Sequence, residues 1–342
     1  LVMDSFKKIV VIGAGTMGQG IAAHLANSSR QVVLLDLKGN NSPNQIAERA
    51  LDIIKKSDPP LLVEKSRLDC IKPGNLTDDF DEMKDADWII EAVVERIDIK
   101  HQLYAKIDQV RSSSSIVSSN TSTIPLSVLT AEMPESMKSD FCITHFFNPV
   151  RFMRLLEIVK TPEFDAAKMD GLVDFCRREL GKGIVICNDT PGFIGNRIGV
   201  YAMQVAMYEA LDRGLPVEIA DALFGRPLGI PKTGVFGLYD LIGIDLMKDV
   251  LASFKKELQP EDPFMDVVKP HAVVEALLDK GYTGNKGPGG FYETKIVDGE
   301  EIVKALNVSD MSYYDFDKVD LPLARRVEKE GMKALLNDDS DY

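Results

Sequence analysis

Apolar and polar positions in the first part of the chain alternate between strand-like runs and helical patterns. A β-branched run over residues 7–12 ends at a glycine turn, and a helical pattern from Thr16 to Asn27 follows it. A second apolar run, from Gln31 to Leu37, completes a β-α-β unit. Such a unit joins two neighbouring strands through a helix, so the pattern predicts that these strands are parallel.

The same alternation continues further along the chain. Helical patterns cover residues 45–56 and 61–69. Short apolar runs then recur, with helical segments between several of them, at residues 88–94, 115–119, 141–147, 155–159 and 184–187. This organisation predicts an α/β fold with a doubly wound, mostly parallel sheet that carries helices on both faces.

The pattern changes at Asn188-Asp189-Thr190-Pro191. Thr190 is suited to cap a helix whose first residue is Pro191, because proline has no N–H that would need a partner there. This helix should carry one apolar face, formed by Ile194, Ile198, Tyr201, Ala202 and Val205. From there to about Tyr292 the pattern is helical, with no convincing strand. We therefore expect an α/β domain at residues 1–190, a smaller all-helical domain at 191–295 and a charged segment at 296–342, which is either peripheral or the start of a truncated element.

Composition and charge exclude several classes of function. The 342 residues include 53 acidic and 40 basic side chains, and the net charge of −13 repels nucleic acid. The four cysteines show no close pairing, so we expect neither a metal site nor a disulfide framework. No apolar run approaches the roughly 20 residues that cross a bilayer. We expect no membrane contact and a soluble, cytoplasmic protein.

A glycine-rich turn follows the first predicted strand. Its residues Gly13, Gly15 and Gly18, with Thr16 and Met17 between them, match the dinucleotide fingerprint, in which the pyrophosphate sits at a helix N-terminus. Eighteen residues past Gly18, Asp36 ends the second strand, where a carboxylate accepts ribose hydroxyls and repels a 2′-phosphate. This spacing favours NAD over NADP, although a nearby Arg30 or Lys38 could still offset a 2′-phosphate.

Oxidation of an alcohol requires a base that takes the hydroxyl proton, and histidine has the best-matched pKa. The chain has four histidines. We interpret His24, His101 and His271 as surface or packing residues. His145 stands near the end of the strand at 141–147, and strand ends of such sheets are where ligands bind.

Glu157 lies twelve residues after His145, in the apolar run Leu155-Leu156-Glu157-Ile158-Val159. An unpaired charge there would be costly. If the chain turns at Asn148-Pro149, Glu157 returns beside His145, where it would hold one imidazole tautomer and stabilise the imidazolium. The alternative is an exposed strand-face glutamate beside a structural histidine.

Three segments resemble signature blocks of the 3-hydroxyacyl-CoA dehydrogenase family, in the same order. They are Ser119-Asn120-Thr121-Ser122-Thr123, His145-Phe146-Phe147-Asn148-Pro149 and residues 189–197. A fourth block, residues 225–229 with 232–238, resembles the helical domain of that family. The resemblance extends from about Lys7 to Tyr292 and implies a Rossmann-like domain that binds NAD.

This resemblance also implies an activity and a set of site residues. It implies NAD-dependent oxidation of L-3-hydroxyacyl-CoA to 3-ketoacyl-CoA in fatty-acid β-oxidation, with His145 as general base and Glu157 as its partner. Ser122 and Asn196 would hydrogen-bond the reacting part of the substrate. The cofactor would be bordered by Glu95, Lys100, Asn148 and, from the helical domain, Lys286.

Other functions and partners remain open. A related dehydrogenase of a free hydroxy or sugar acid would share the fold and the histidine, and a non-catalytic crystallin-like protein could use the same scaffold. The family resemblance implies a homodimer. It also extends to the dehydrogenase part of bacterial proteins that carry a fused enoyl-CoA hydratase, and we expect this chain to be an excised part of such a protein.

Overall fold

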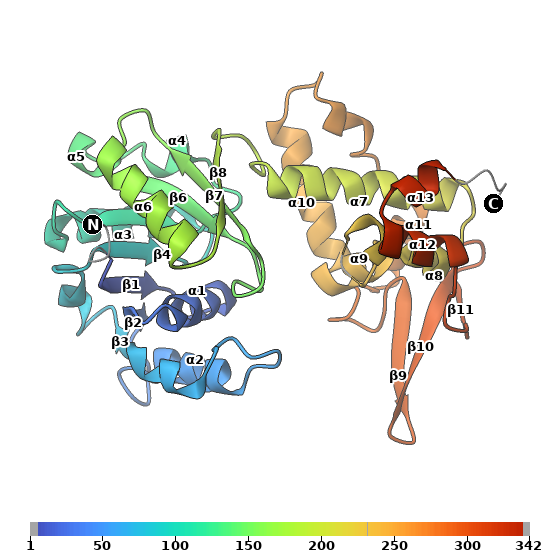
Figure 1. Ribbon diagram of the computed structural model, residues 1–342, viewed down its shortest axis with the longest axis horizontal. Helices are drawn as coiled ribbons and strands as arrows, with labels where there is room; N and C mark the ends of the chain where they lie inside the picture. Colours follow the sequence, from blue (N-terminus) through green and yellow to red (C-terminus); the bar gives the residue numbers. More distant parts are fainter. Residues whose placement is uncertain (1–5, 231, 338–342) are drawn as a thin grey trace. The chain divides into compact units, whose positions relative to one another are not determined.

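The computed structural model describes residues 6–230 and 232–337. The chain divides into two compact units, Leu1–Gly195 and Asn196–Tyr342, which we call the N-terminal and C-terminal units. Figure 1 shows a helix-covered sheet in the first unit and mainly helices in the second.

An eight-stranded sheet forms the centre of the N-terminal unit, in the order β3-β2-β1-β4-β5-β6-β7-β8. All neighbouring strands are parallel except β6 and β7, which are antiparallel. The strands are β1 (Lys8–Ile12), β2 (Gln31–Asp36), β3 (Ile71–Asn75), β4 (Trp88–Glu91), β5 (Ile116–Ser119), β6 (Phe141–Phe146), β7 (Leu155–Lys160) and β8 (Gly183–Cys187).

Helices cover both faces of this sheet, as the sequence predicts (Figure 1). Successive residues of β1 face opposite ways: Ile9 and Val11 belong to one apolar cluster, Val10 and Ile12 to the other. The helices are α1 (Thr16–Asn27), α2 (Gln45–Lys56), α3 (Ile97–Val110), α4 (Leu126–Leu129), α5 (Glu135–Lys138) and α6 (Ala166–Arg178), with 3₁₀ turns η1 (Lys65–Cys70) and η2 (Phe80–Met83).

The sequence prediction is confirmed for most of these elements, and α1 and α2 begin and end where expected. It is wrong at residues 61–69, where the structure has bends and the 3₁₀ turn η1 instead of an α-helix. It also missed β3, because Pro73 and Gly74 disfavour a strand. These residues are tolerated because β3 is an edge strand, which has a partner on one side only.

The C-terminal unit combines helices with a small sheet. Its helices are α7 (Gly195–Asp212), α8 (Val217–Leu223), α9 (Phe236–Ile242), α10 (Ile244–Glu257), α11 (Ala272–Asp279), α12 (Pro322–Glu330) and α13 (Lys333–Leu336), with 3₁₀ turns η3 (Arg226–Leu228) and η4 (Pro263–Asp266). The antiparallel sheet has the order β11-β10-β9, from β9 (Tyr292–Val297), β10 (Glu300–Asn307) and β11 (Ser312–Tyr314). The core includes Met207, Phe236, Tyr239 and Phe291.

This small sheet lies largely in the segment that we expected to be peripheral and charged. Ala305 and Leu306 of β10 are buried in the core of the unit, so the segment is part of its fold. The prediction failed because charged residues such as Glu300, Glu301 and Lys304 interrupt the apolar pattern of the hairpin. Residues 338–342 of that segment lie outside the described residues.

Helix α7 begins at Gly195 and not at Pro191, so the predicted cap at Thr190 is wrong. Gly192 and Phe193 have φ of 70° and 50°, values that an α-helix does not contain. The predicted apolar face is also not the buried one. Ile198 is 64% exposed, and the buried residues of α7 are Met203, Gln204, Ala206, Met207, Ala210 and Leu211. Among the described helices, none is long and apolar enough to cross a membrane.

The packing of α1 on β1 yields a prediction about Gly18. A Cβ added there would lie 1.7 Å from the carbonyl oxygen of Gly13, whereas one added at Gly171, inside α6, meets nothing within 4 Å. We expect Gly18→Ala to lower the free energy of unfolding by about 1–3 kcal/mol or more, because helix and strand must separate. We expect Gly171→Ala to raise it by about 0.5–1 kcal/mol, because alanine favours the helix. Urea unfolding of both variants tests this, and equal effects would contradict it.

Candidate active site

Two strands that run in opposite directions bring His145 and Glu157 together. The register of β6 against β7 pairs these two residues directly, and their side chains extend from adjacent backbone positions. The imidazole Nδ1 lies 2.7 Å from Oε2 of Glu157, and both residues are buried. The structure therefore places Glu157 beside His145, as the sequence predicts for a chain that turns at Asn148-Pro149.

The second oxygen of Glu157 is also occupied. Oε1 accepts the backbone N–H groups of Ile194, at 2.9 Å, and Gly195, at 2.6 Å. Burial by itself raises the pKa of the Glu157 carboxyl. The hydrogen bonds from His145, Gly195 and Ile194 outweigh burial, so this pKa lies below its ordinary value. The carboxylate is thus held ionised beside the imidazole.

Aromatic rings fix the plane of the imidazole. The Phe147 ring is tilted against it at a centroid distance of 4.5 Å, and the Phe193 ring meets it edge-on at 5.6 Å. A side chain at Gly195 would reach within 2.6 Å of the Phe147 ring, so that glycine permits the packing. Because Nδ1 is bound to Glu157, Nε2 is the ring nitrogen that a substrate can use.

Ser122 lies in the loop after β5, as expected, and is partly exposed. This loop is tied to β6 through Asn120, whose Oδ1 accepts the backbone N–H of Phe146 at 2.9 Å. Phe146 follows His145 in the chain, so one side chain links the Ser122 loop to the strand that carries the imidazole. Asn148, at the exposed turn after β6, lies three residues beyond His145.

Two predicted site residues belong to the C-terminal unit. Asn196 is the second residue of α7 and is partly exposed, whereas a helix from Pro191 would hold it one turn further from the N-terminus. Lys286 lies in the loop before β9, and its ammonium pairs with Asp245 at 2.7 Å. Their approach to the residues of the N-terminal unit stays a prediction.

The glycine turn has the conformation that the fingerprint requires. Gly13 has φ of 105°, and an added Cβ would lie 2.4 Å from the carbonyl oxygen of Ala92. Gly18 packs on Gly13, whereas a Cβ at Gly15 would meet nothing within 4 Å. Thr16 and Met17 begin α1, where the first backbone N–H groups have no partner inside the helix. The turn therefore leaves an open helix N-terminus that fits a pyrophosphate.

Asp36 lies beside this glycine turn, and we call the turn and Asp36 together the glycine cradle. Its carboxylate accepts the N–H of Ala14 and the N–H of Leu37, each at 2.6 Å. The two cations that could have offset a 2′-phosphate are engaged elsewhere: Lys38 pairs with Asp78 at 2.9 Å and Arg30 with Glu179 at 3.3 Å. Gly13, Gly15 and Asp36 line one cavity with apolar residues, which include Leu76 after β3, Val93 after β4 and Leu103 of α3.

Glu95 and Lys100 are joined to a buried group that sequence reasoning missed. Lys100 is almost fully buried, and its ammonium lies 2.6 Å from Oε1 of Glu91 and 3.7 Å from Oε2 of Glu95. Glu95 is exposed and accepts the hydroxyl of Thr121 at 2.8 Å. Glu95 therefore connects the buried Lys100 to the surface, and the approach of both residues to a cofactor stays a prediction. The missed signal was a carboxylate that ends the apolar run Trp88-Ile89-Ile90-Glu91.

The remaining candidates behave as packing residues. His24 Nε2 bonds the carbonyl of Leu180, His101 Nε2 bonds that of Val128, and His271 Nδ1 accepts the N–H of Val273 at the start of α11. The four cysteines are free thiols. Within residues 6–230 and 232–337 no group of three His, Cys, Asp or Glu side chains is placed to hold a metal ion.

The fold and the site define a Rossmann-type dinucleotide-binding protein. Its histidine–carboxylate pair lies where the carboxyl ends of the parallel strands meet. Comparisons with known proteins agree. Residues 8–190 match the family model described as "3-hydroxyacyl-CoA dehydrogenase, NAD binding domain", and residues 192–294 match the C-terminal domain of the same family. The chain belongs to the 3-hydroxyacyl-CoA dehydrogenase family.

Similar proteins include both long and short members. A Rickettsia felis protein, named for a fatty acid oxidation complex trifunctional enzyme, is 41% identical over 93% of this chain and 44% of its own length. The mouse mitochondrial hydroxyacyl-coenzyme A dehydrogenase is 34% identical over 84% of this chain and 91% of its own length. The crystal structure of Escherichia coli 3-hydroxybutyryl-CoA dehydrogenase has 29% identity and a TM-score of 0.70, and covers 84% of this chain and 60% of the other. The chain thus spans less than half the length of the first of these relatives.

The lowered pKa of Glu157 predicts how stability depends on pH. A carboxyl whose pKa is lower in the folded than in the unfolded state stabilises the fold above its ordinary pKa of 4.5, and this contribution is lost as pH falls through the folded value. We expect Glu157→Gln to lower the free energy of unfolding by about 1–3 kcal/mol at neutral pH. The difference from the unmodified protein should shrink below pH 4.5.

Denaturant unfolding between pH 7 and pH 3 measures this difference. Glu163→Gln is the matched control, because Glu163 is an exposed carboxylate outside the site. A Glu157→Gln effect that stays constant over the whole pH range would contradict a lowered pKa.

Proposed function

We propose that this chain oxidises the 3-hydroxyl group of an L-3-hydroxyacyl-CoA thioester to the 3-ketoacyl thioester, with NAD as oxidant, in fatty-acid β-oxidation. The observation that carries the proposal is the buried His145–Glu157 pair, at the same edge of the sheet as the glycine cradle. Membership of the 3-hydroxyacyl-CoA dehydrogenase family supports the choice of substrate class.

In this proposal His145 is the general base. Its Nε2 accepts the proton of the 3-hydroxyl group, and the imidazole becomes an imidazolium. Glu157 stabilises that positive charge through the 2.7 Å hydrogen bond to Nδ1 and keeps the neutral ring in the tautomer that has a free Nε2. When bound, NAD supplies the nicotinamide that accepts the hydride from C3.

Ser122 and Asn196 would hold the reacting oxygen. A serine hydroxyl can donate a hydrogen bond to the developing carbonyl, and an amide can donate or accept one. The link from Asn120 to Phe146 supports this role for the Ser122 loop, because it fixes the loop relative to the strand of His145. Asn196 follows directly in the chain after Gly195, whose N–H is bound to Glu157.

The residues that would hold NAD surround the cradle. The N–H groups at Thr16, Met17 and Gly18 would bind the pyrophosphate, and Asp36 would accept the adenosine ribose hydroxyls. Glu95 and Asn148 would border the rest of the cofactor, with Lys100 acting through Glu95 and Lys286 approaching from the C-terminal unit. The engagement of Lys38 by Asp78 supports NAD over NADP.

We further propose a homodimer and a larger functional context. The exposed apolar face of α7, which includes Ile198 and Tyr201, supports association of the C-terminal unit with a second copy. The name of the Rickettsia relative supports a role as the dehydrogenase part of a longer protein that also carries an enoyl-CoA hydratase. The cytoplasmic location stays a prediction.

NADH formation from matched substrates tests the proposed function. We expect reduction of NAD with a 3-hydroxyacyl-CoA thioester and none with the corresponding free 3-hydroxy acid. His145→Gln should slow turnover by roughly 10² to 10⁴ fold at nearly unchanged NADH affinity, because the variant loses the base but keeps the cradle.

His271→Gln is the matched control, since His271 caps α11 in the C-terminal unit and takes no part in the pair. Turnover of the free acid in place of the thioester would favour a hydroxy-acid or sugar-acid dehydrogenase. NADH binding without turnover of either substrate would favour a non-catalytic role, and near-normal turnover by His145→Gln would remove that residue from the mechanism.

Asp36 should determine the choice of dinucleotide. Its carboxylate orders the Ala14 and Leu37 N–H groups and excludes a 2′-phosphate by charge repulsion. We expect Asp36→Ser to weaken NAD binding by roughly tenfold, about 1.4 kcal/mol, and to make NADP binding measurable. Dissociation constants of NADH and NADPH from fluorescence titration measure both effects. Unchanged discrimination between the two would show that Asp36 does not contact the ribose.

A further inference from the structure

A second buried carboxylate, Glu91, ends β4 beside the cofactor cradle and has no exposed surface. Its Oε1 accepts Lys100 Nζ at 2.6 Å and the Val93 N–H at 2.7 Å. Its Oε2 accepts the hydroxyls of Tyr104 and Ser119, each at 2.6 Å. Four donors thus converge on one carboxylate, and they come from α3, from the end of β5 and from the residues after β4.

Stability alone gives a poor account of this arrangement. Burying an ion pair costs solvation free energy, and apolar side chains of similar size commonly stabilise a fold as well or better. The burial of Tyr104, together with the charge of Glu91, holds the pKa of the Tyr104 phenol well above its ordinary value, so this hydroxyl remains a donor. What the network does provide is a fixed relative position of three segments.

One part of the network, which we call the cofactor arm, connects Glu91 through Lys100 to Glu95. The Lys100 ammonium lies between Glu91 and Glu95, at 2.6 Å and 3.7 Å from their oxygens. Ala92, the residue after Glu91, lies against Gly13 and lines the same cavity as Gly13 and Asp36. Glu91 therefore holds both Lys100, which faces the exposed Glu95, and the segment that the glycine turn rests on.

The other part of the network, which we call the substrate arm, connects Glu91 through Ser119 to the loop that carries Ser122. The Ser119 hydroxyl, which donates to Glu91, accepts the N–H of Thr121 at 3.2 Å. The backbone N–H of Asn120 donates to the carbonyl of Glu91 at 2.8 Å. Asn120 in turn holds the N–H of Phe146. The loop that carries Ser122 is thus fixed to Glu91 at its first residues, and Thr121 joins the two arms through its hydrogen bond to Glu95.

We propose that Glu91 is a positioning residue that sets Glu95 for the cofactor and the Ser122 loop for the substrate, through Lys100 and Ser119 respectively. This inference rests on the proposed function, because it assigns Glu95 and Ser122 to the two sides of the reaction. It goes beyond that function in assigning a role to a group that touches neither cofactor nor substrate.

A charge-balanced double variant separates positioning from stability. Glu91→Gln leaves the Lys100 ammonium with only Glu95, and Lys100→Met leaves the Glu91 carboxylate without its cation. Both single variants should be unstable. The double variant Glu91→Gln/Lys100→Met is neutral, so we expect it to recover most of the lost stability. Its NADH affinity should remain about tenfold weaker than that of the unmodified protein, because Glu95 has lost the ammonium of Lys100.

The second arm is tested by Ser119→Ala. This change removes the link from Glu91 to Thr121, and we expect kcat to fall about tenfold or more while NADH affinity stays unchanged, because small displacements of a positioning loop slow the chemical step. The two arms should thus separate, one changing NADH affinity and the other changing kcat.

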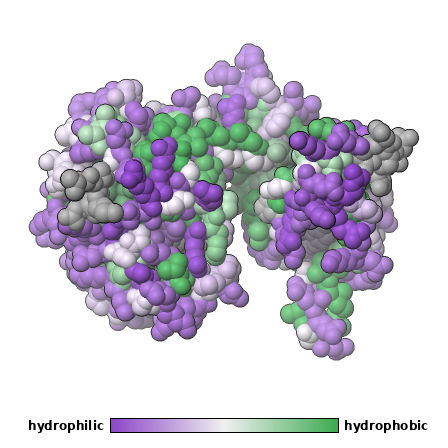
Figure 2. Space-filling model, in the orientation of Figure 1, coloured by the Kyte–Doolittle hydropathy of each residue, from purple (hydrophilic) through white to green (hydrophobic). Residues whose placement is uncertain are grey.

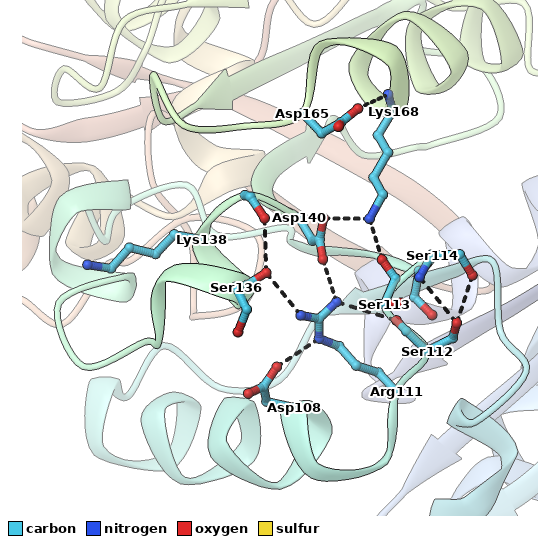
Figure 3. A network of polar contacts seen from close by, with 12 residues as sticks. Asp108, Arg111, Ser112, Ser113, Ser114, Ser136, Lys138, Asp140, Asp165 and Lys168 are labelled. Atoms are coloured by element: carbon cyan, nitrogen blue, oxygen red, sulfur yellow. Dashed lines mark hydrogen bonds and ion pairs between the residues drawn. The ribbon is translucent and has the colours of Figure 1, made fainter.

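Asp140→Asn is the matched control for loss of a buried carboxylate. Asp140 precedes β6, at the sheet edge opposite His145, and binds Arg111 and Lys168 in the network of Figure 3. We expect this variant to lose stability with unchanged NADH affinity and kcat. If the double variant regains NADH affinity together with its stability, or if Ser119→Ala keeps its kcat, Glu91 is structural only and the inference is overturned.

NADH binding is measured by fluorescence, without turnover, so failure of the proposed function is distinguishable from failure of this inference. If the unmodified protein binds NADH but oxidises no 3-hydroxyacyl-CoA, the proposed function fails, while the affinity comparison still decides the cofactor arm. If it oxidises the thioester and the affinity of the double variant is normal, only the role of Glu91 fails.

Discussion

One reversal of strand direction determines the candidate site. The sheet is parallel except where β7 runs against β6, and this antiparallel step pairs His145 with Glu157. Two strands joined by a short loop can place residues twelve positions apart opposite each other, whereas a parallel neighbour needs a longer crossover. The antiparallel pairing of β6 and β7 is therefore what brings these two side chains together. Once the register is fixed, the imidazole and the carboxylate are neighbours, and a slip of one strand by one residue would turn its side chain to the other face and separate the two.

Two buried carboxylates, Glu91 and Glu157, lie at the same end of the sheet, and each is held in place by several hydrogen-bond donors. Each is saturated by donors: Glu157 accepts an imidazole nitrogen and two backbone N–H groups, and Glu91 accepts an ammonium, two hydroxyls and one backbone N–H. A buried carboxylate with fewer partners is costly, because its lost contacts with water are not replaced. The full set of donors is what keeps each charge fixed in place, and a fixed charge can orient a base or a loop.

The sequence predicted those parts of the fold that depend on local pattern. The ends of α1 follow from the glycine turn and its apolar spacing, and Glu157 was found because apolar residues flank it on both sides. Glu91 was missed because it ends its strand, a position where carboxylates are usually solvated. Its burial depends on Tyr104 and Ser119, which lie 13 and 28 residues away. The start of α7 was predicted wrongly for a related reason, since the N–H groups of Ile194 and Gly195, which a helix from Pro191 would pair with its own carbonyls, are bound instead by Glu157, 37 residues before Ile194 in the chain.

The hydrogen bonds from Ile194 and Gly195 to Glu157 fix the backbone where the N-terminal unit ends. The chain passes from the N-terminal to the C-terminal unit at Gly195 and Asn196, and the N–H groups of Ile194 and Gly195 are both held by Glu157. The left-handed turn at Gly192 and Phe193 directs this segment, and the Phe193 ring packs on the imidazole of His145. The carboxylate that binds His145 thus also holds the backbone at the end of the N-terminal unit. A change in that segment acts on the carboxylate that binds His145, so the histidine–carboxylate pair and the backbone at residues 192–195 depend on each other.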